Sequence, residues 1–172
     1  SYTSLLIDGF FPNQENGIPE LIKFNQLLEI PLSGEVEVNI ISKKSTIIDL
    51  DSMNLFKILP HQRSISKGED ASNIPFQMNS KVYSKNKFIN YQLARVVKKS
   101  IFRKHQLSNL EICPFEYNPV LNQLKIHHEL NLEIIFKNGS LENDRILNKQ
   151  YNQREFSPIL NFSNRTSQEE SK

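Results

Sequence analysis

Residues 124–136 have the sequence LKIHHELNLEIIF, and its apolar and polar side chains alternate. A period of two places successive side chains on opposite faces of a strand, which is typical of a strand with one buried and one solvated face. At thirteen residues the stretch is longer than an ordinary strand, so it is expected to cross a whole sheet. The expected apolar face consists of Leu124, Ile126, His128, Leu130, Leu132, Ile134 and Phe136.

Shorter patterns of the same kind precede this stretch. Val36, Val38 and Ile40 alternate with polar residues, and further short strands are expected at 26–30, 45–50, 82–84, 95–97 and 107–113. Pro-, Gly- and Asn-containing turns separate them. Many short strands with such turns favour an all-β fold, an antiparallel β-sandwich or barrel-like, jelly-roll-like body. We expect this body to span residues 1–137.

The chain beyond the tight turn at residues 137–140 looks different. Residues 138–172 are expected to form an extended C-terminal arm, with one short helix over residues 154–162 and a disordered end. The apolar side chains of this arm are scattered along a polar sequence.

Composition limits the classes of function. The chain has 172 residues, 21 Lys and Arg against 19 Asp and Glu, and a formal net charge of +2. This balance argues against a nucleic-acid partner, and no apolar run is long enough to predict a membrane span. A single cysteine excludes an internal disulfide and a multi-cysteine metal site. No signal peptide is recognisable at the start of the sequence.

Candidate catalytic groups lack the expected surroundings. Cys113 lies between Ile112 and Pro114 at the end of a predicted strand, where a free cysteine usually packs in the core. His127 and His128 are adjacent, so on a strand they point to opposite faces and do not converge on a metal. No cofactor or metal site is expected, and the chain does not look like an enzyme. Residues 64–73 are polar and mixed in charge, which is typical of a solvated loop.

The order of several motifs resembles a known family. Gly17-Ile18-Pro19-Glu20-Leu21 comes first, Ile58-Leu59-Pro60-His61-Gln62 follows, and Cys113-Pro114-Phe115-Glu116-Tyr117-Asn118-Pro119 leads into Asn122-Gln123-Leu124-Lys125-Ile126. This succession resembles the N-terminal propeptide of gingipain-type, caspase-like secreted cysteine peptidases of Bacteroidota. Glu20 departs from the pattern, because a second proline is expected there.

The resemblance implies a propeptide that keeps a downstream cysteine protease latent and assists its folding. The partner is then the cognate caspase-like protease domain, in cis or after cleavage, and the location is the periplasm, the cell surface or the outside of a Gram-negative bacterium with type IX secretion. In this family a propeptide loop is thought to enter the substrate cleft, and a basic side chain fills the specificity pocket. The matching residues here are Lys85, Asn86, Lys87, Phe88, Ile89, Asn90 and Tyr91.

The resemblance also suggests roles for single residues in this loop and in the C-terminal arm. Lys87 is the first candidate for the basic side chain, with Lys85 or Arg95 as the alternative, and Phe88 and Tyr91 are the expected apolar anchors. Arg165 and Lys172 are candidate processing positions in the arm.

Two other classes of function stay open. One is a non-inhibitory β-module, either in a gingipain-like sortase of type IX secretion or as a surface adhesion or glycan-binding domain, although the chain has no Trp to build a glycan platform. The other is an enzyme that depends on Cys113.

Overall fold

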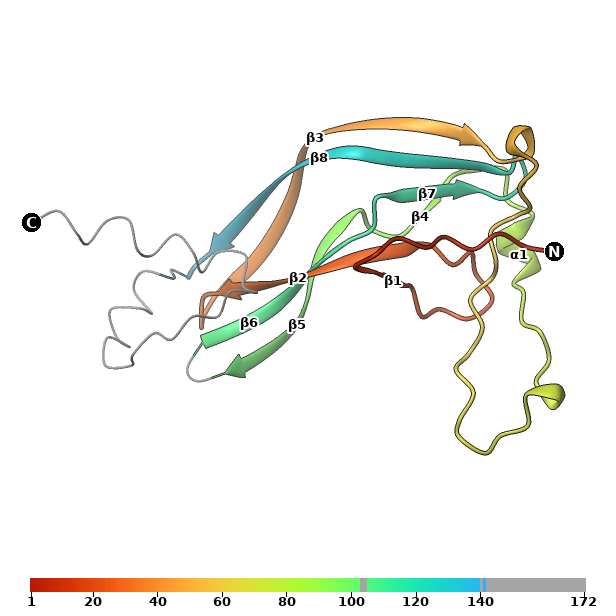
Figure 1. Cartoon of the computed structure of the whole chain (residues 1–172). Coiled ribbons are helices and arrows are strands. Elements are labelled where there is room, and N and C mark those ends of the chain that lie inside the picture. The colour runs from red at the N-terminus through yellow and green to blue at the C-terminus, as the bar shows by residue number, and fades with distance from the viewer. Residues whose placement is uncertain (103–104, 140, 142–172) are drawn as a thin grey trace, which may run out of the picture. The chain divides into compact units, whose positions relative to one another are not determined.

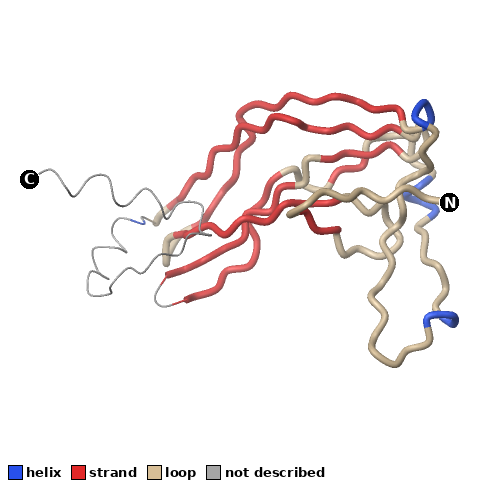
Figure 2. Tube along the Cα trace, viewed as in Figure 1, coloured by secondary structure: helices blue, strands red, loops and turns tan. Residues whose placement is uncertain are grey.

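The computed structural model describes residues 1–102, 105–139 and 141. Strands dominate this part of the chain, which confirms the predicted all-β class (Figure 2). The strands are β1 (Phe10–Pro12), β2 (Ile22–Ile30), β3 (Glu35–Asp49), β4 (Ile89–Asn90), β5 (Ala94–Phe102), β6 (His105–Ile112), β7 (Phe115–Asn118) and β8 (Gln123–Lys137). The helical elements are short, namely α1 (Ser80–Tyr83) and the 3₁₀ turns η1 (Asp51–Met53) and η2 (Ala71–Asn73).

The strands form two four-stranded sheets, with orders β1-β2-β6-β5 and β3-β8-β7-β4 (Figure 1). The pairs β1–β2, β4–β7, β5–β6 and β7–β8 are antiparallel. The chain divides into two compact units. The first unit holds residues 1–24, 43–93 and 113–130, and the second holds the described residues of 25–42, 94–112 and 131–141.

Apolar side chains from both sheets form the core of the first unit. Its buried members are Leu21, Ile22, Leu50, Ile58, Cys113, Phe115, Tyr117 and Leu124. Phe10 on β1 meets Phe115 on β7 edge to face, with ring centroids 6.2 Å apart. Within this unit the two sheets therefore pack against each other through apolar side chains, which is the main source of its stability.

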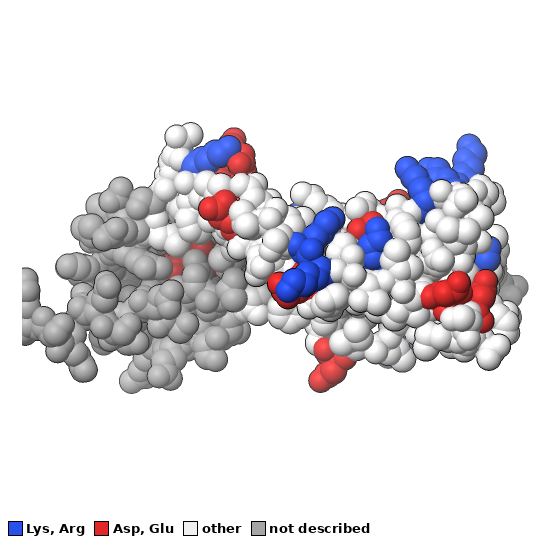
Figure 3. Space-filling model, turned by 90° about the horizontal axis from the view of Figure 1, so that it is seen from above, with Lys and Arg blue, Asp and Glu red and all other residues white. Residues whose placement is uncertain are grey.

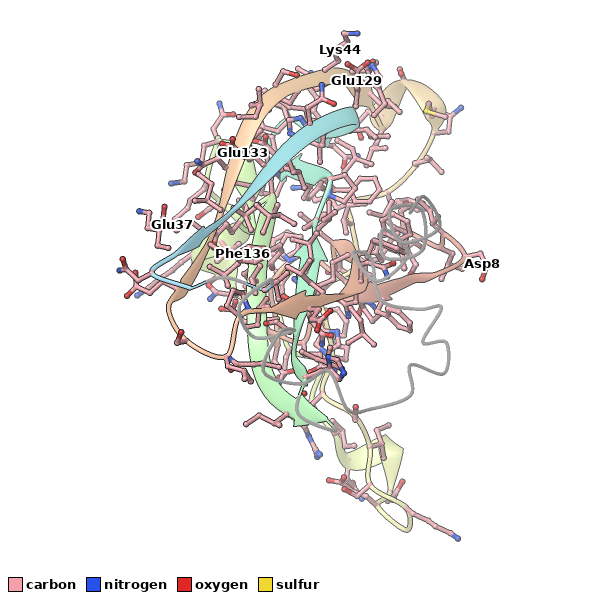
Figure 4. All side chains as sticks on the ribbon, turned by 90° about the vertical axis from the view of Figure 1, so that its left-hand side faces the viewer. Asp8, Glu37, Lys44, Glu129, Glu133 and Phe136 are labelled. Carbon is pink, nitrogen blue, oxygen red and sulfur yellow. The ribbon has the colours of Figure 1, made fainter. Side chains whose placement is uncertain are left out.

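The long strand predicted at residues 124–136 is β8, which extends from Gln123 to Lys137. Between Glu129 and Glu133, exposed and partly buried side chains alternate as expected. Lys44 on β3 and Glu129 on β8 form an exposed ion pair, with Nζ 2.8 Å from Oε2 (Figure 4).

The predicted orientation of the two adjacent histidines is wrong. His127 is buried and His128 is exposed. Glu116 on neighbouring β7 places its Oε1 2.6 Å from Nε2 of His127, and the backbone N–H of His127 donates to the Pro114 carbonyl. Burial of a polar ring costs less when a partner bonds it, and the Glu116 carboxylate bonds Nε2, while Nδ1 has no hydrogen-bond partner among the described residues.

One predicted strand is also wrong. Residues 82–84 form the end of α1 rather than a strand, because the side chain of Asn79 caps the helix by accepting a hydrogen bond from the Val82 N–H at 3.3 Å. The helix expected at residues 154–162 lies outside the described residues, as does almost all of the expected arm.

Two tight turns meet in the second unit. Gly34 precedes β3, and Gly139 follows β8. A Cβ on Gly34 would lie 2.1 Å from the Lys137 carbonyl oxygen, and a Cβ on Gly139 would lie 2.1 Å from the Ser33 carbonyl oxygen. Only glycine permits this approach of the two backbones.

Candidate functional site

The predicted contact residues connect α1 to β4, the strand that pairs with β7, and we call them the 85–91 segment. Lys85, Asn86 and Lys87 are exposed. Ile89 and Asn90 form β4 itself. The segment therefore presents two lysine side chains to solvent next to a hydrogen-bonded strand.

The two expected apolar anchors pack on the chain itself. Phe88 is partly buried, and Nζ of Lys125 lies 4.1 Å from the centre of its ring. The Tyr91 side chain packs against the core of the first unit, and its hydroxyl donates to the Pro19 carbonyl at 3.4 Å. These contacts hold the C-terminal half of the 85–91 segment to the body.

A second contact holds the N-terminal half of the segment. The side-chain amide of Asn118, at the end of β7, donates to Oδ1 of Asn86 at 3.0 Å. Lys85 and Lys87 flank Asn86. The hydrogen bond to Asn118 therefore holds the residue between the two lysines in place. A segment that is ordered before binding loses less conformational entropy when it is bound.

Buried tyrosines anchor α1, the helix from which the segment starts. The Tyr83 hydroxyl donates to the Ile58 carbonyl at 2.7 Å, and the Ile58 N–H donates to the Tyr117 oxygen at 3.3 Å. The Tyr117 hydroxyl donates in turn to Oδ1 of Asn122 at 2.8 Å. Burial raises the pKa of Tyr117 to about 12, and it also raises the pKa of Tyr83 well above its ordinary value. Both hydroxyls therefore stay protonated and keep donating at neutral pH.

The alternative basic candidate has a partner already. Arg95 lies on β5 in the second unit, and its Nε and Nη2 atoms both donate to Oε2 of Glu111, at 2.9 and 2.7 Å. The 85–91 segment belongs to the first unit. The candidate processing residues Arg165 and Lys172 lie outside the described residues.

The groups considered for catalysis are built into the fold. Cys113 is 4% exposed and belongs to the core of the first unit. Among the described residues, no cluster of three or more His, Cys, Asp or Glu side chains is suited to hold a metal ion. No helix in the described part of the chain is long and apolar enough to cross a membrane.

The face seen in Figure 3 carries charges of both signs. Lys and Arg side chains lie among Asp and Glu side chains over the face seen in Figure 3. Several of these charges are paired across strands, including Lys137 with Glu37 at 2.5 Å.

The solvated loop predicted at residues 64–73 is part of a longer exposed element with side-chain contacts of its own. Residues 62–79, which we call the 62–79 loop, project from the first unit between Pro60 and α1 (Figure 1). Arg63 and Glu69 form an ion pair within it. In the sequence, the ion pair is visible only as opposite charges six residues apart, at Arg63 and Glu69. Such spacing alone does not predict a projecting loop.

The fold defines a class of protein, an all-β domain built of two antiparallel sheets. The particular family follows from the comparison with known sequences. The Propeptide_C25 family model matches residues 12–167, and the chain belongs to this family of propeptides. This confirms the resemblance to gingipain propeptides, and the chain is a non-catalytic propeptide rather than a protease domain.

Curated relatives include Lys-gingipain of Porphyromonas gingivalis, which is 28% identical over 160 residues, covering 93% of this chain and 9% of the relative. Gingipain R1 of the same species is 29% identical over 136 residues, covering 79% of this chain and 13% of the relative. The chain thus spans about a tenth of the length of these relatives.

Two solved structures share the fold. One, from work on the zymogenic latency of gingipain K of Porphyromonas gingivalis, has a TM-score of 0.71 and 30% identity, covering 81% of this chain and 75% of that one. The other is a complex of the pro- and mature domains of Porphyromonas gingivalis RgpB, with a TM-score of 0.65 and 22% identity over 77% of this chain and 67% of that one. The second similarity concerns the fold alone.

Proposed function

We propose that the chain keeps a gingipain-like cysteine protease latent and assists its folding. The observation that carries this proposal is the match of residues 12–167 to the propeptide family. The similarity to the structure concerned with zymogenic latency of gingipain K supports it. The partner is the cognate caspase-like protease domain, and the setting is the periplasm, the cell surface or the outside of a Gram-negative bacterium.

The proposed contact with the protease is the 85–91 segment. Lys85 and Lys87 are exposed, and the hydrogen bond to Asn86 and the packing of Phe88 hold the backbone around them. Lys87 is the proposed basic side chain for the specificity pocket. Arg95 is the weaker alternative, because Glu111 holds its guanidinium group.

A covalent link makes modest contacts sufficient. A domain tethered to its partner meets it at an effective concentration of about a millimolar. Cleavage removes this advantage, and only the free energy of the interface then holds the two parts together. Arg165 and Lys172 are the proposed processing positions, in an arm over residues 138–172 that follows the body of residues 1–137.

The test is inhibition in trans. The chain is added to its cognate protease domain, and the inhibition constant is measured with a peptide substrate. Loss of one buried cationic contact costs about 2–5 kcal/mol, so Lys87→Ala should weaken inhibition at least tenfold. The control is Lys57→Ala, which removes an exposed lysine outside the 85–91 segment.

Each result has a separate meaning. A wild-type chain that does not slow the protease contradicts the proposed function. Inhibition by the wild-type chain together with equal inhibition by Lys87→Ala keeps the function and removes Lys87 from it.

A further inference from the structure

The apolar face of β8 is buried at one end of the strand and partly exposed at the other. In the first unit, Leu124 is 4% exposed and Ile126 packs against the core. Leu132, Ile134 and Phe136 follow on the same face of the strand, in the second unit, and each of them is only partly buried. The strand therefore carries its apolar face beyond the core that covers its first half.

The neighbouring strand β3 continues this face (Figure 1). Glu37 and Lys137 form an ion pair across the two strands, which places both side chains on the polar face of the sheet. Because successive side chains point to opposite faces, Val36, Val38 and Phe136 lie on the apolar face. Val36 and Val38 are also only partly buried. We name the set the β3–β8 apolar face; its members are Val36, Val38, Leu132, Ile134 and Phe136.

The other sheet of the second unit is better covered. Leu28 and Ile30 on β2, and Leu107 and Leu110 on β6, are buried. By contrast, no apolar residue of β3 or β8 that the structure describes in this unit is fully buried. A contiguous apolar face that stays partly in water is typical of a surface that a further segment or molecule covers.

A segment of this chain with the right composition follows β8 directly. Residues 142–172 lie outside the described residues, and their sequence holds seven large apolar side chains within 146–162 and none within 163–172. The family match extends to residue 167, so the apolar stretch belongs to the propeptide domain itself. Phe156, Ile159 and Leu160 would form one stripe on the short helix that the sequence predicts there.

This stretch is within reach of the face. Gly139 lies against the turn that precedes β3, which fixes the point where the chain leaves the sheet. Ile146 comes seven residues later, and an extended chain spans about 3.3–3.6 Å per residue, so Ile146 reaches about 23–25 Å from Gly139. The strand covers only about 14 Å from Phe136 back to Leu132. A chain that turns back after Gly139 can therefore lay residues 146–162 along the whole face.

A tethered segment has an advantage over a separate molecule at this surface. Linked to β8 by a few residues, it meets the face at an effective concentration of about a millimolar, in every copy of the chain. A second copy or a protease domain would have to displace it.

We infer that residues 146–162 fold back over the β3–β8 apolar face and complete the core of the second unit, with Phe156, Ile159 and Leu160 as the main contact. The inference does not depend on the proposed function, because it concerns contacts within one chain. Both proposed processing positions, Arg165 and Lys172, follow this stretch in the sequence. A cut at either one would leave the docked segment on the propeptide.

The experiment is amide hydrogen exchange of the full chain, read by mass spectrometry over residues 131–137. A chain with both Phe156→Ser and Leu160→Ser is expected to exchange at least tenfold faster there than the wild type, because an uncovered strand opens more readily. Its fluorescence with the dye ANS, which binds exposed apolar surface, should rise as well. Residues 124–126, in the first unit, should exchange at the wild-type rate.

The matched control changes polar side chains of the same stretch. A chain with both Gln153→Ser and Asn161→Ser should exchange like the wild type throughout. Leu160→Ala alone covers the case in which the apolar double variant unfolds, and it should speed exchange over residues 131–137 a few fold.

The outcomes separate the possible occupants of the face. Faster exchange confined to residues 131–137, in the apolar variants and not in the control, supports the inference. Equal rates in Leu160→Ala and the wild type overturn it. Protection of residues 131–137 that grows with chain concentration, or that needs added cognate protease domain, also overturns it, because the occupant is then a second copy or the protease.

Discussion

Replacing Gly34 by alanine tests the meeting of the two turns in the second unit. The new Cβ would lie 2.1 Å from the Lys137 carbonyl oxygen, 2.8 Å from the Asn138 carbonyl carbon and 2.9 Å from the Gly139 nitrogen. All three atoms belong to backbone, so a side-chain rotation does not relieve the clash. The φ of +90° at Gly34 adds strain for any residue with a Cβ.

The expected cost combines opposing contributions. Left-handed strain costs about 1–2 kcal/mol, and forced overpacking costs about 1–3 kcal/mol. Alanine also restricts the unfolded chain, which stabilises the fold by about 0.4–1 kcal/mol. The free energy of unfolding should therefore fall by about 1–5 kcal/mol. With a urea m-value of about 2 kcal/mol/M, the midpoint should fall by about 0.5–2.5 M.

Gly68→Ala is the matched control. Gly68 has nearly the same φ, +92°, but no atom lies within 4 Å of the position that a Cβ would take. This variant carries the strain without the clash, so a smaller midpoint shift, below about 1 M, is expected at the same m-value. Urea unfolding followed by circular dichroism measures both variants. Equal midpoints for Gly34→Ala and Gly68→Ala would refute the steric reasoning.

Three further predictions concern buried side chains. The raised pKa values of Tyr83, Tyr91 and Tyr117 predict that these tyrosines ionise only above pH 10 in the folded chain, as seen by tyrosinate absorbance. For Tyr117 the stabilisation is fully present below the unfolded pKa of about 10 and is lost as the pH rises towards 12, so unfolding midpoints should fall over that range. Tyr117→Phe removes the acceptor of the Ile58 N–H and should cost about 1–3 kcal/mol in urea unfolding; an unchanged midpoint would show that this hydrogen bond contributes nothing. Cys113 should resist thiol reagents in the folded chain and react in denaturant, and fast labelling under native conditions would contradict its burial.

Local pattern was sufficient for much of the architecture. Alternation in residues 124–136 predicted β8, because side-chain direction in a strand depends only on position along the chain. Turn residues marked the ends of β2 and β8 for the same local reason. The order of the motifs around Pro19, Pro60 and Pro119 indicated the family, which the match over residues 12–167 confirms.

Other features depended on residues that are distant in sequence. Nε2 of the buried His127 pairs with Glu116 on the neighbouring strand, and α1 is held because the Tyr83 hydroxyl donates to the Ile58 carbonyl. Alternation along one strand does not reveal which side chain its neighbour supplies.

The 62–79 loop combines features set by neighbouring residues with features set by residues distant in sequence. Its polar composition correctly indicated exposure, which follows from the solvation of each residue separately. Its projection depends on Gln62 meeting Gln77 and on Arg63 meeting Glu69. The sequence alone predicted the positions of β2, β3, β5, β6 and β8 and the turns between them, because those are properties of neighbouring residues, but it placed a strand where α1 forms. The tertiary structure decided which contacts fasten the 62–79 loop, because hydrogen bonds and ion pairs form only where the folded chain brings their partners together.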